Sequence, residues 1–275
     1  MSKAVFTTVR GAFAGLAMAV ATLTLSGCGS SDDDSNYVEQ PVEVLYNRAL
    51  DDLGTQNYKA AAKGFEEVDR QHPYSVWATK AQIMAAFAYY QSNQYDEAII
   101  ALDRFIQLHP GHRDIPYAYY LKALCFYEQI SDVGRDQRVT QQALDALAEV
   151  VKRFPESPYA RDARLKVELA IDHLAGKEMS VGRYYQSNQQ YVGAINRYRV
   201  VIERYQTTTH VPEALHRLVE SYLSLGVKQE AQETAAVLGY NFPGSEWYQD
   251  SYYLMTGEGT PAPSDEKRGW FFGLF

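Results

Sequence analysis

Cysteine is scarce in this chain of 275 residues, which contains only Cys28 and Cys125. No C-x-x-C motif is present, which excludes the common redox and zinc arrangements built on paired thiols. Cys125 lies in the apolar stretch YYLKALCFYEQ, where a thiol normally behaves as a small hydrophobic side chain. We therefore expect Cys125 to be buried and unreactive. If Cys28 serves as an attachment point, no internal disulfide can form.

The familiar signatures of catalysis are also missing. The chain has no GxSxG, no HExxH and no phosphate-binding P-loop. His109 and His112 are close in sequence, but they fall in a turn with no carboxylate or thiolate spaced to complete a metal site. The aspartates at 32–34 match no calcium loop and are typical of a solvated spacer. We expect a protein that is not an enzyme and needs no cofactor or metal.

Basic residues are outnumbered by acidic ones, 26 to 34, which gives a net charge of −8. Proteins that bind DNA or RNA need a positively charged face for the phosphates. The charge balance therefore argues against a nucleic-acid partner.

Long hydrophobic runs are absent except at the start of the chain. Residues 11–25 carry no charge, and the ten residues before them include Lys3 and Arg10 but no acid. The run is shorter than the roughly 20 residues that a membrane-spanning helix needs. A basic start followed by a short apolar core is typical of a secretory signal, so residues 1–27 are predicted to be a signal peptide.

The end of this run, Leu25-Ser26-Gly27-Cys28, resembles the lipobox of bacterial lipoproteins. The resemblance implies a diacylglycerol thioether on Cys28, cleavage before it and acylation of the new amine. Two or more acyl chains anchor a protein stably. Gly29, rather than Asp, follows Cys28. By analogy with enterobacterial lipoproteins this implies the periplasmic face of the outer membrane, with residues 28–40 as a tether. The alternative is an ordinary signal peptide with an accidental cysteine.

An internal repeat fills the rest of the chain. Residues 45–73 and 82–110 share alanines, a tyrosine and a final proline in register, with a period of 37. Three further copies follow, the third with an insertion near residues 131–140. The pattern resembles the tetratricopeptide repeat, a helix–turn–helix unit of about 34 residues. We predict an all-α solenoid of about five helix pairs and a closing helix near 245–255, with units 1–3 in 41–157 and units 4–5 plus the closing helix in 158–256.

Each position in the repeat has a physical role. Small residues let the two helices of a unit approach closely, and aromatic or apolar residues fill the gap to the next unit. Prolines end the second helix, and residues 158–187 contain no strong breaker, so one long helix is expected there. The small residues are Ala49, Ala61, Ala86, Ala98, Gly182 and Ala194; the fillers are Tyr58, Phe65, Tyr95, Leu102 and Tyr198; the prolines are Pro73, Pro110, Pro155 and Pro243; the helix starts are Ser75, Asp114, Ser157, Thr209 and Ser245.

Tyrosine is abundant, with 22 copies. In the tetratricopeptide fold, particular first-helix positions line one surface, and here that register selects mainly aromatic residues. Such a surface suits an extended peptide rich in aromatics. The alternative is that several of these tyrosines pack between helices. The candidate peptide-binding residues are Tyr46, Lys80, Phe87, Tyr90, Tyr117, Tyr120 and Tyr127.

The chain ends in a flexible tail, predicted over residues 257–275. Residues 256–268 (TGEGTPAPSDEKR) have the composition of a linker, and GWFFGLF follows. This last segment is either a frayed end or a docking peptide for a partner groove or a membrane surface.

Four stretches resemble the BamD family, the lipoproteins of the β-barrel assembly machinery. They are residues 103–110 (DRFIQLHP), 118–124 (AYYLKAL), the inserted 132–136 (DVGRD) and 194–198 (AINRY). The resemblance covers essentially the whole chain after Cys28, except the tail after Gly257. It implies a non-enzymatic scaffold on the outer membrane.

The resemblance also implies partners. In that family the C-terminal repeats contact the POTRA domains of the barrel protein BamA, and the N-terminal repeats are proposed to receive unfolded outer-membrane proteins. Other assembly-machinery lipoproteins are further expected partners. Asn196 and Arg197 correspond to the BamA-facing side, where Arg197 would donate a charge-assisted hydrogen bond. The alternatives are a solvated helix face for Arg197 and, for the whole protein, an unrelated repeat lipoprotein that organises peptidoglycan enzymes.

Overall fold

The computed structural model describes residues 39–258. The predicted signal peptide, Cys28, most of the tether and the tail from residue 259 lie outside this range. Their assignments stay predictions. Within residues 39–258 the chain forms eleven helices and no strand, which confirms the all-α prediction.

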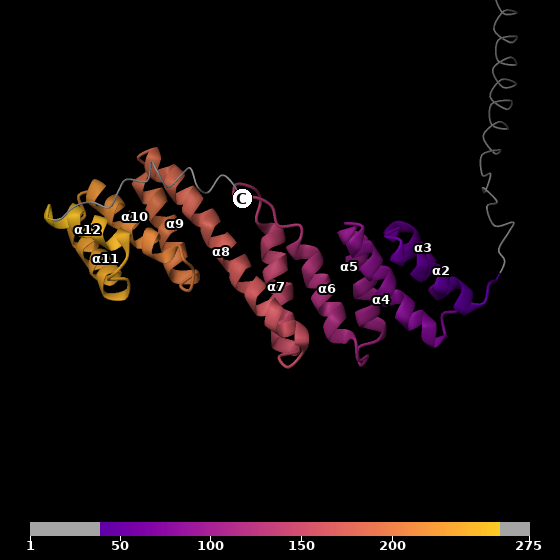
Figure 1. Cartoon of the computed structure of the whole chain (residues 1–275). Coiled ribbons are helices and arrows are strands. Elements are labelled where there is room, and N and C mark those ends of the chain that lie inside the picture. The colour runs from indigo at the N-terminus through magenta and orange to yellow at the C-terminus, as the bar shows by residue number, and fades with distance from the viewer. Residues whose placement is uncertain (1–38, 259–275) are drawn as a thin grey trace, which may run out of the picture. The chain divides into compact units, whose positions relative to one another are not determined.

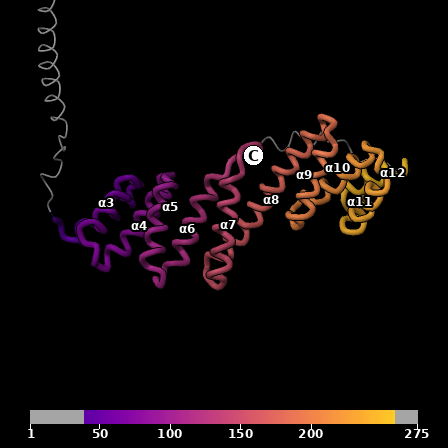
Figure 2. Tube along the Cα trace, turned by 180° about the vertical axis from the view of Figure 1, so that it is seen from behind, coloured from indigo at the N-terminus to yellow at the C-terminus, as the bar shows by residue number. Residues whose placement is uncertain are grey.

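The helices form five consecutive pairs and a closing helix (Figures 1 and 2). Each helix packs against its neighbours in sequence, and α2, α4, α6 and α8 also contact one another in turn. The first helices of units 1–4 therefore form one continuous layer. The helices are α2 (Val42–Gly54), α3 (Tyr58–Gln71), α4 (Val76–Gln91), α5 (Tyr95–Leu108), α6 (Ile115–Tyr127), α7 (Arg138–Arg153), α8 (Pro158–Ser187), α9 (Tyr191–Arg204), α10 (Val211–Ser224), α11 (Lys228–Asn241) and α12 (Glu246–Thr256).

Small side chains stand where the helices of a pair cross. The five predicted alanines are fully buried. A methyl group on Gly182 would overlap the ring of Tyr198, which is itself fully buried. These contacts explain why the repeat requires a small residue at this position.

The turn inside a pair uses a left-handed residue at the same place in four units. Gln56, Asn93 and Gln189 have φ of 62°, 59° and 60°, and Gly226 has 78°. Non-glycine residues adopt this conformation infrequently. Its recurrence at matching positions shows that the repeat extends to backbone geometry.

The prolines predict where helices end better than the predicted start residues predict capping bonds. α3, α5, α7 and α11 each end two residues before a proline. At the starts, the hydroxyls of Ser75 and Ser245 accept hydrogen bonds at 3.1 Å from the amides of Ala78 and Tyr248, as expected.

Three of the predicted helix starts lack a side-chain capping bond, although Asp114 and Ser157 directly precede α6 and α8 as predicted. Asp114 has φ −92° and ψ 11°, outside the extended region that an N-cap needs, and its carboxylate lies 3.4 Å from Arg113. The N-cap of α10 is His210, because the hydroxyl of Thr209 donates to Asp172 on α8 instead. Ser157 makes no capping bond, and α8 begins with Pro158.

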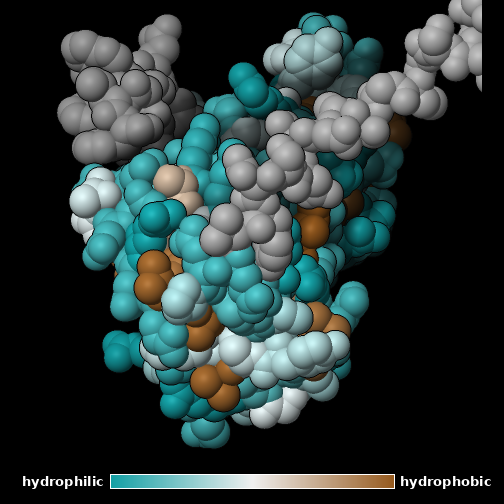
Figure 3. Space-filling view, turned by 90° about the vertical axis from the view of Figure 1, so that its right-hand side faces the viewer, coloured by the Kyte–Doolittle hydropathy of each residue, from teal (hydrophilic) through white to brown (hydrophobic). Residues whose placement is uncertain are grey.

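The long helix expected over 158–187 is present as α8, with 30 residues. It packs on α6 and α7 on one side and on α9 on the other. No described helix combines the length and the apolar character needed to cross a membrane. On the face drawn in Figure 3, hydrophobic residues appear as separate spots among hydrophilic ones.

Candidate functional site

The layer of first helices carries a cluster of tyrosines that we call the tyrosine surface. It comprises Tyr90 on α4, Tyr117, Tyr120 and Tyr127 on α6, and Tyr159 on α8. All five are half-buried, so part of each ring remains open to solvent. Contacts between α4 and α6 and between α6 and α8 hold the cluster together.

The centre of the tyrosine surface is a stack of rings. Tyr120 lies parallel to Tyr159 at 5.2 Å between centroids, and Tyr117 meets the same ring at 5.5 Å. Such geometries contribute beyond simple area burial and hold the rings in fixed orientations. The Tyr120 hydroxyl donates to Asp162 at 2.5 Å. A fixed aromatic ledge with a polar edge results.

Charged groups border this ledge. Lys166 donates to Asp162 at 3.0 Å, and its ammonium lies 5.4 Å from the ring centroid of Tyr127. Burial alone would raise the pKa of Asp162, but the hydrogen bonds from Lys166 and Tyr120 outweigh it and lower that pKa. The carboxylate therefore stays charged at neutral pH. At the α4 end, Tyr90 donates to Glu128 at 3.4 Å.

The tyrosines themselves stay protonated. Burial raises the pKa of Tyr90 and of Tyr117 to about 12. Their hydroxyls are therefore neutral hydrogen-bond donors at any physiological pH. An extended peptide could find ring faces, hydroxyl donors and a few charges on this surface.

Three predicted residues of units 1 and 2 contribute less to the tyrosine surface than their register predicts. Tyr46 is only 8% exposed and packs between Phe65, at 5.4 Å, and Trp77, at 4.8 Å. Lys80 is exposed, with its ammonium 5.2 Å from the Trp77 ring. Phe87 is half-buried and packs on the core shared by α4, α5 and α6. These three predicted residues lie on the first helices, but they do not form one open aromatic strip.

The inserted loop builds a hollow that the sequence pattern did not reveal. The loop folds onto α8: Lys177 donates to the carbonyl of Gly134 at 2.9 Å, and His173 lies 3.0 Å from the Gln137 side-chain oxygen. The loop borders a hollow of about 570 Å³, which Tyr127 of the tyrosine surface and Glu128 also line. We call it the loop hollow. Its other lining residues are Ile130, Val133, Leu169, Asp172, His173, Gly176, Arg183 and His210.

The residues matched to the partner-facing side lie on α9. Asn196 is exposed. Arg197 is 43% exposed, and one of its guanidinium nitrogens donates to Glu178 on α8 at 3.2 Å. A guanidinium has five N–H donors, so Arg197 can keep this intramolecular bond and still bind a partner's carboxylate.

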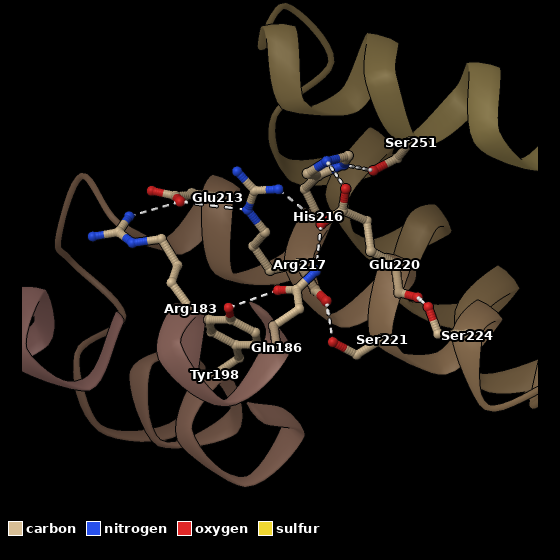
Figure 4. A network of polar contacts seen from close by, with 10 residues as sticks. All are labelled: Arg183, Gln186, Tyr198, Glu213, His216, Arg217, Glu220, Ser221, Ser224 and Ser251. Atoms are coloured by element: carbon tan, nitrogen blue, oxygen red, sulfur yellow. Dashed lines mark hydrogen bonds and ion pairs between the residues drawn. The ribbon is translucent and has the colours of Figure 1, made fainter. Parts of the chain in front are cut away.

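Units 4 and 5 contain a second polar cluster, the charge network, shown in Figure 4. Arg217 lies 2.9 Å from Glu220 and 3.6 Å from Glu213, and Arg183 on α8 pairs with Glu213 at 2.8 Å. Gln186 also donates to Glu220, at 2.8 Å. The network thus joins α8 to α10.

The same network reaches α9 and α12. The hydroxyl of buried Tyr198 donates to Gln186 at 2.7 Å, and His216 lies 2.8 Å from Ser251. Burial alone would raise the pKa of Glu220, but the contacts with His216 and Arg217 outweigh it and lower that pKa to about 2. The charged form of Glu220 is therefore strongly favoured in the folded protein.

Other chemistry is sparse in the described part of the chain. Cys125 is a buried free thiol whose pKa burial raises to about 12. His109 lies 3.0 Å from the Gln82 side-chain oxygen. Residues 39–258 contain no cluster of three or more side chains that could hold a metal ion.

Comparison with known proteins identifies the family to which the chain is similar. Residues 38–238 match the sequence model of the YfiO family, described as outer membrane lipoproteins. Relatives named outer membrane protein assembly factor BamD include one from Caulobacter vibrioides, 49% identical over 92% of this chain and 84% of its own length. Another, from Rickettsia prowazekii, is 46% identical over 87% of this chain and 95% of its own length.

Solved structures give weaker likenesses. The tetratricopeptide domain of P58(IPK) has a TM-score of 0.40 at 15% identity, over 78% of this chain and 56% of that one. The TPR2AB domain of yeast Sti1, solved as a complex with pHSP90, also has a TM-score of 0.40, at 11% identity, over 78% and 82% of the two chains. The sequence matches, in contrast, extend across most of both chains, and by them this chain belongs to the BamD (YfiO) family of outer membrane lipoproteins.

Proposed function

We propose that this protein promotes the folding and insertion of outer-membrane proteins as a lipid-anchored, non-enzymatic scaffold. The observation behind the proposal is the 49% identity to a relative named outer membrane protein assembly factor BamD. Cys28 would carry the acyl chains that hold the scaffold on the periplasmic face of the outer membrane. The protein would work without a cofactor.

The tyrosine surface is the proposed site for unfolded clients. Its stacked rings are fixed before any peptide arrives, which lowers the entropy lost on binding. Extended segments of β-barrel proteins alternate apolar and polar side chains. Ring faces would take the former, while the hydroxyls and Asp162 would take the latter or the backbone. The loop hollow extends this surface from Tyr127 to α8 and to His210, the residue before α10.

Units 4 and 5 are the proposed site for the POTRA domains of a BamA-like barrel protein. Asn196 and the open part of Arg197 would face that partner, and other lipoproteins of the assembly machinery would join the same complex. The charge network supports the site by holding α8, α9, α10 and α12 in fixed positions.

Client binding is tested with an aromatic-rich peptide from the C-terminal strand of an outer-membrane barrel, measured by fluorescence anisotropy. Replacing both Tyr90 and Tyr127 by Ala should weaken binding about tenfold, a loss of ~1.4 kcal/mol. Tyr74→Ala is the matched control, because this tyrosine is fully exposed outside the tyrosine surface. Unchanged affinity in the double variant would remove the tyrosine surface from client binding.

Partner binding is tested by affinity capture of the full-length lipoprotein from detergent extracts, followed by mass spectrometry. The wild type should capture a barrel protein with POTRA domains, and Arg197→Glu should reduce its yield because the charge is reversed. Arg199→Glu, on the same helix, is the control. Capture of peptidoglycan enzymes without a barrel protein would instead favour the alternative scaffold.

A further inference from the structure

Two hollows occupy equivalent places on the layer of second helices. One, of about 200 Å³, lies between α3 and α5 over α4, and the other, of about 300 Å³, lies between α9 and α11 over α10. We call them the first and second outer hollows. Eight lining residues of the first correspond to eight of the second with a constant offset of 133 positions, among them Asp69 with Ile202, Gln82 with Leu215, and Arg104 with Val237. The same backbone pocket thus occurs twice with different side chains.

The first outer hollow satisfies its own polar groups. Asp69 is nearly buried and pairs with Arg104 at 3.0 Å, while Gln82 donates to it at 2.8 Å. His109 lies 3.0 Å from the Gln82 oxygen. The polar side chains of this pocket therefore bind mainly one another.

The second outer hollow replaces that network with apolar side chains. Its lining includes Ile202, Leu215, Leu218, Tyr222 and Val237. On the exposed side of α11, Val237 is 47% accessible, and Tyr240, one turn away, is 88% accessible. The rim carries the acids Glu203 and Glu233 and the base Arg199. An apolar pocket flanked by exposed apolar side chains is typical of a docking site.

We propose that the tail of this same chain docks here, with the aromatic side chains of residues 270–272 in the second outer hollow. The sequence after the described helices supplies the matching chemistry: GWFFGLF, preceded directly by Lys267 and Arg268. The aromatic rings suit the apolar lining, and the two basic residues suit the acidic rim, where Glu233 stands beside a Glu203 that already pairs with Arg199 at 3.0 Å.

The tail has the reach to dock within its own chain. α12, which precedes it, packs on α10 and α11, and both of those helices line the hollow. The ten residues 259–268 span up to about 33 Å when extended. The 14 residues of α11 are about 21 Å long. The linker can therefore pass the whole length of α11 before the aromatic segment begins.

Docking within the chain gives the tail a role. It covers an apolar surface that would otherwise face solvent on units 4 and 5.

Site-specific photocrosslinking tests the proposal in the full-length protein in detergent. A benzoylphenylalanine at Val237 should crosslink to the peptide that contains residues 269–275. The same group at Arg104, the equivalent position in the first outer hollow, should give no crosslink to the tail. Absence of the tail crosslink at Val237 would overturn the proposal. Mixing heavy-isotope and normal chains separates docking within one chain from docking between copies, and heavy–light crosslinks would overturn it too.

A second measurement does not depend on the crosslinker. The chain has three tryptophans, so fluorotryptophan labelling gives three fluorine signals, and Trp270→Phe assigns the one from the tail. In the wild type this signal should be protected from a soluble paramagnetic agent. Val237→Lys should raise its accessibility about tenfold, which corresponds to ~1.4 kcal/mol, whereas Arg104→Lys should leave it unchanged. A Trp270 signal that is fully accessible in the wild type would rule out docking.

Discussion

In units 2 and 3 the tyrosines of the first helices keep part of their rings open to solvent, whereas in units 4 and 5 the polar side chains of α8 and α10 bind one another. Tyr120 and Tyr159 expose a stacked ledge with Asp162 at its edge. Tyr198, in contrast, is fully buried and donates its hydroxyl to Gln186 inside the charge network. One repeat pattern thus supports a partly exposed aromatic surface in one half and an internally bonded block in the other.

The largest loss of stability is expected from replacing Glu220 in the charge network. Replacing it by Gln leaves the partly buried Arg217 without its nearest carboxylate, and removing one partner of such a pair costs about 3 kcal/mol. Hydrogen exchange of α10 should accelerate, and that of α4 should not. Glu203→Gln, in an exposed pair with Arg199, is the control and should change stability by less than about 1 kcal/mol. Equal effects of the two variants would show that the network adds no stability.

The same residue predicts a pH dependence for units 4 and 5. The folded pKa of Glu220, about 2, lies below the ordinary value of 4.5, so its contribution is present above pH 4.5 and is lost as the pH falls toward 2. Stability of α10 should therefore decline over this window in the wild type and more gently in Glu220→Gln. Identical acid profiles would contradict the assignment.

An intermediate loss of stability is expected from Gly182→Ala. The new methyl group would overlap the buried Tyr198 ring, and overpacking of this kind costs about 1–3 kcal/mol. Gly54→Ala is the matched change at the end of α2, where an added methyl meets nothing within 4 Å. Thermal unfolding should show a loss for the first variant and none for the second.

The smallest loss of stability is expected when one hydroxyl is removed from each half by the same change, Tyr→Phe. Tyr198→Phe leaves the partly buried Gln186 oxygen without its donor and should cost about 1–2 kcal/mol. Tyr120→Phe removes a bond to Asp162, which keeps Lys166 and solvent, and should cost about 0.5 kcal/mol. Urea unfolding measures both, and a reversed order would mean that the tyrosine surface is the more rigid region.

The sequence predicted the helix pairs, the long α8 and the buried alanines because each follows from a period of 37 and from local breakers. The repeat pattern did not predict that Tyr46 is buried, because this burial depends on Trp77, which belongs to the next unit. The charge network joins residues from Arg183 to Ser251, and no local pattern links positions so far apart. The loop hollow likewise depends on an insertion that folds back onto α8.

The 30 residues of α8 belong to both halves, since the helix packs on α7 and on α9 without a break. An α-helix advances about 1.5 Å and turns about 100° per residue. One residue inserted near its middle would therefore rotate everything that follows by more than a quarter turn. The length of this single helix therefore fixes the rotation between the proposed client-binding half and the proposed partner-binding half. A substitution on its surface acts on the contacts of one side chain, whereas a change in its residue count would act on the whole second half at once.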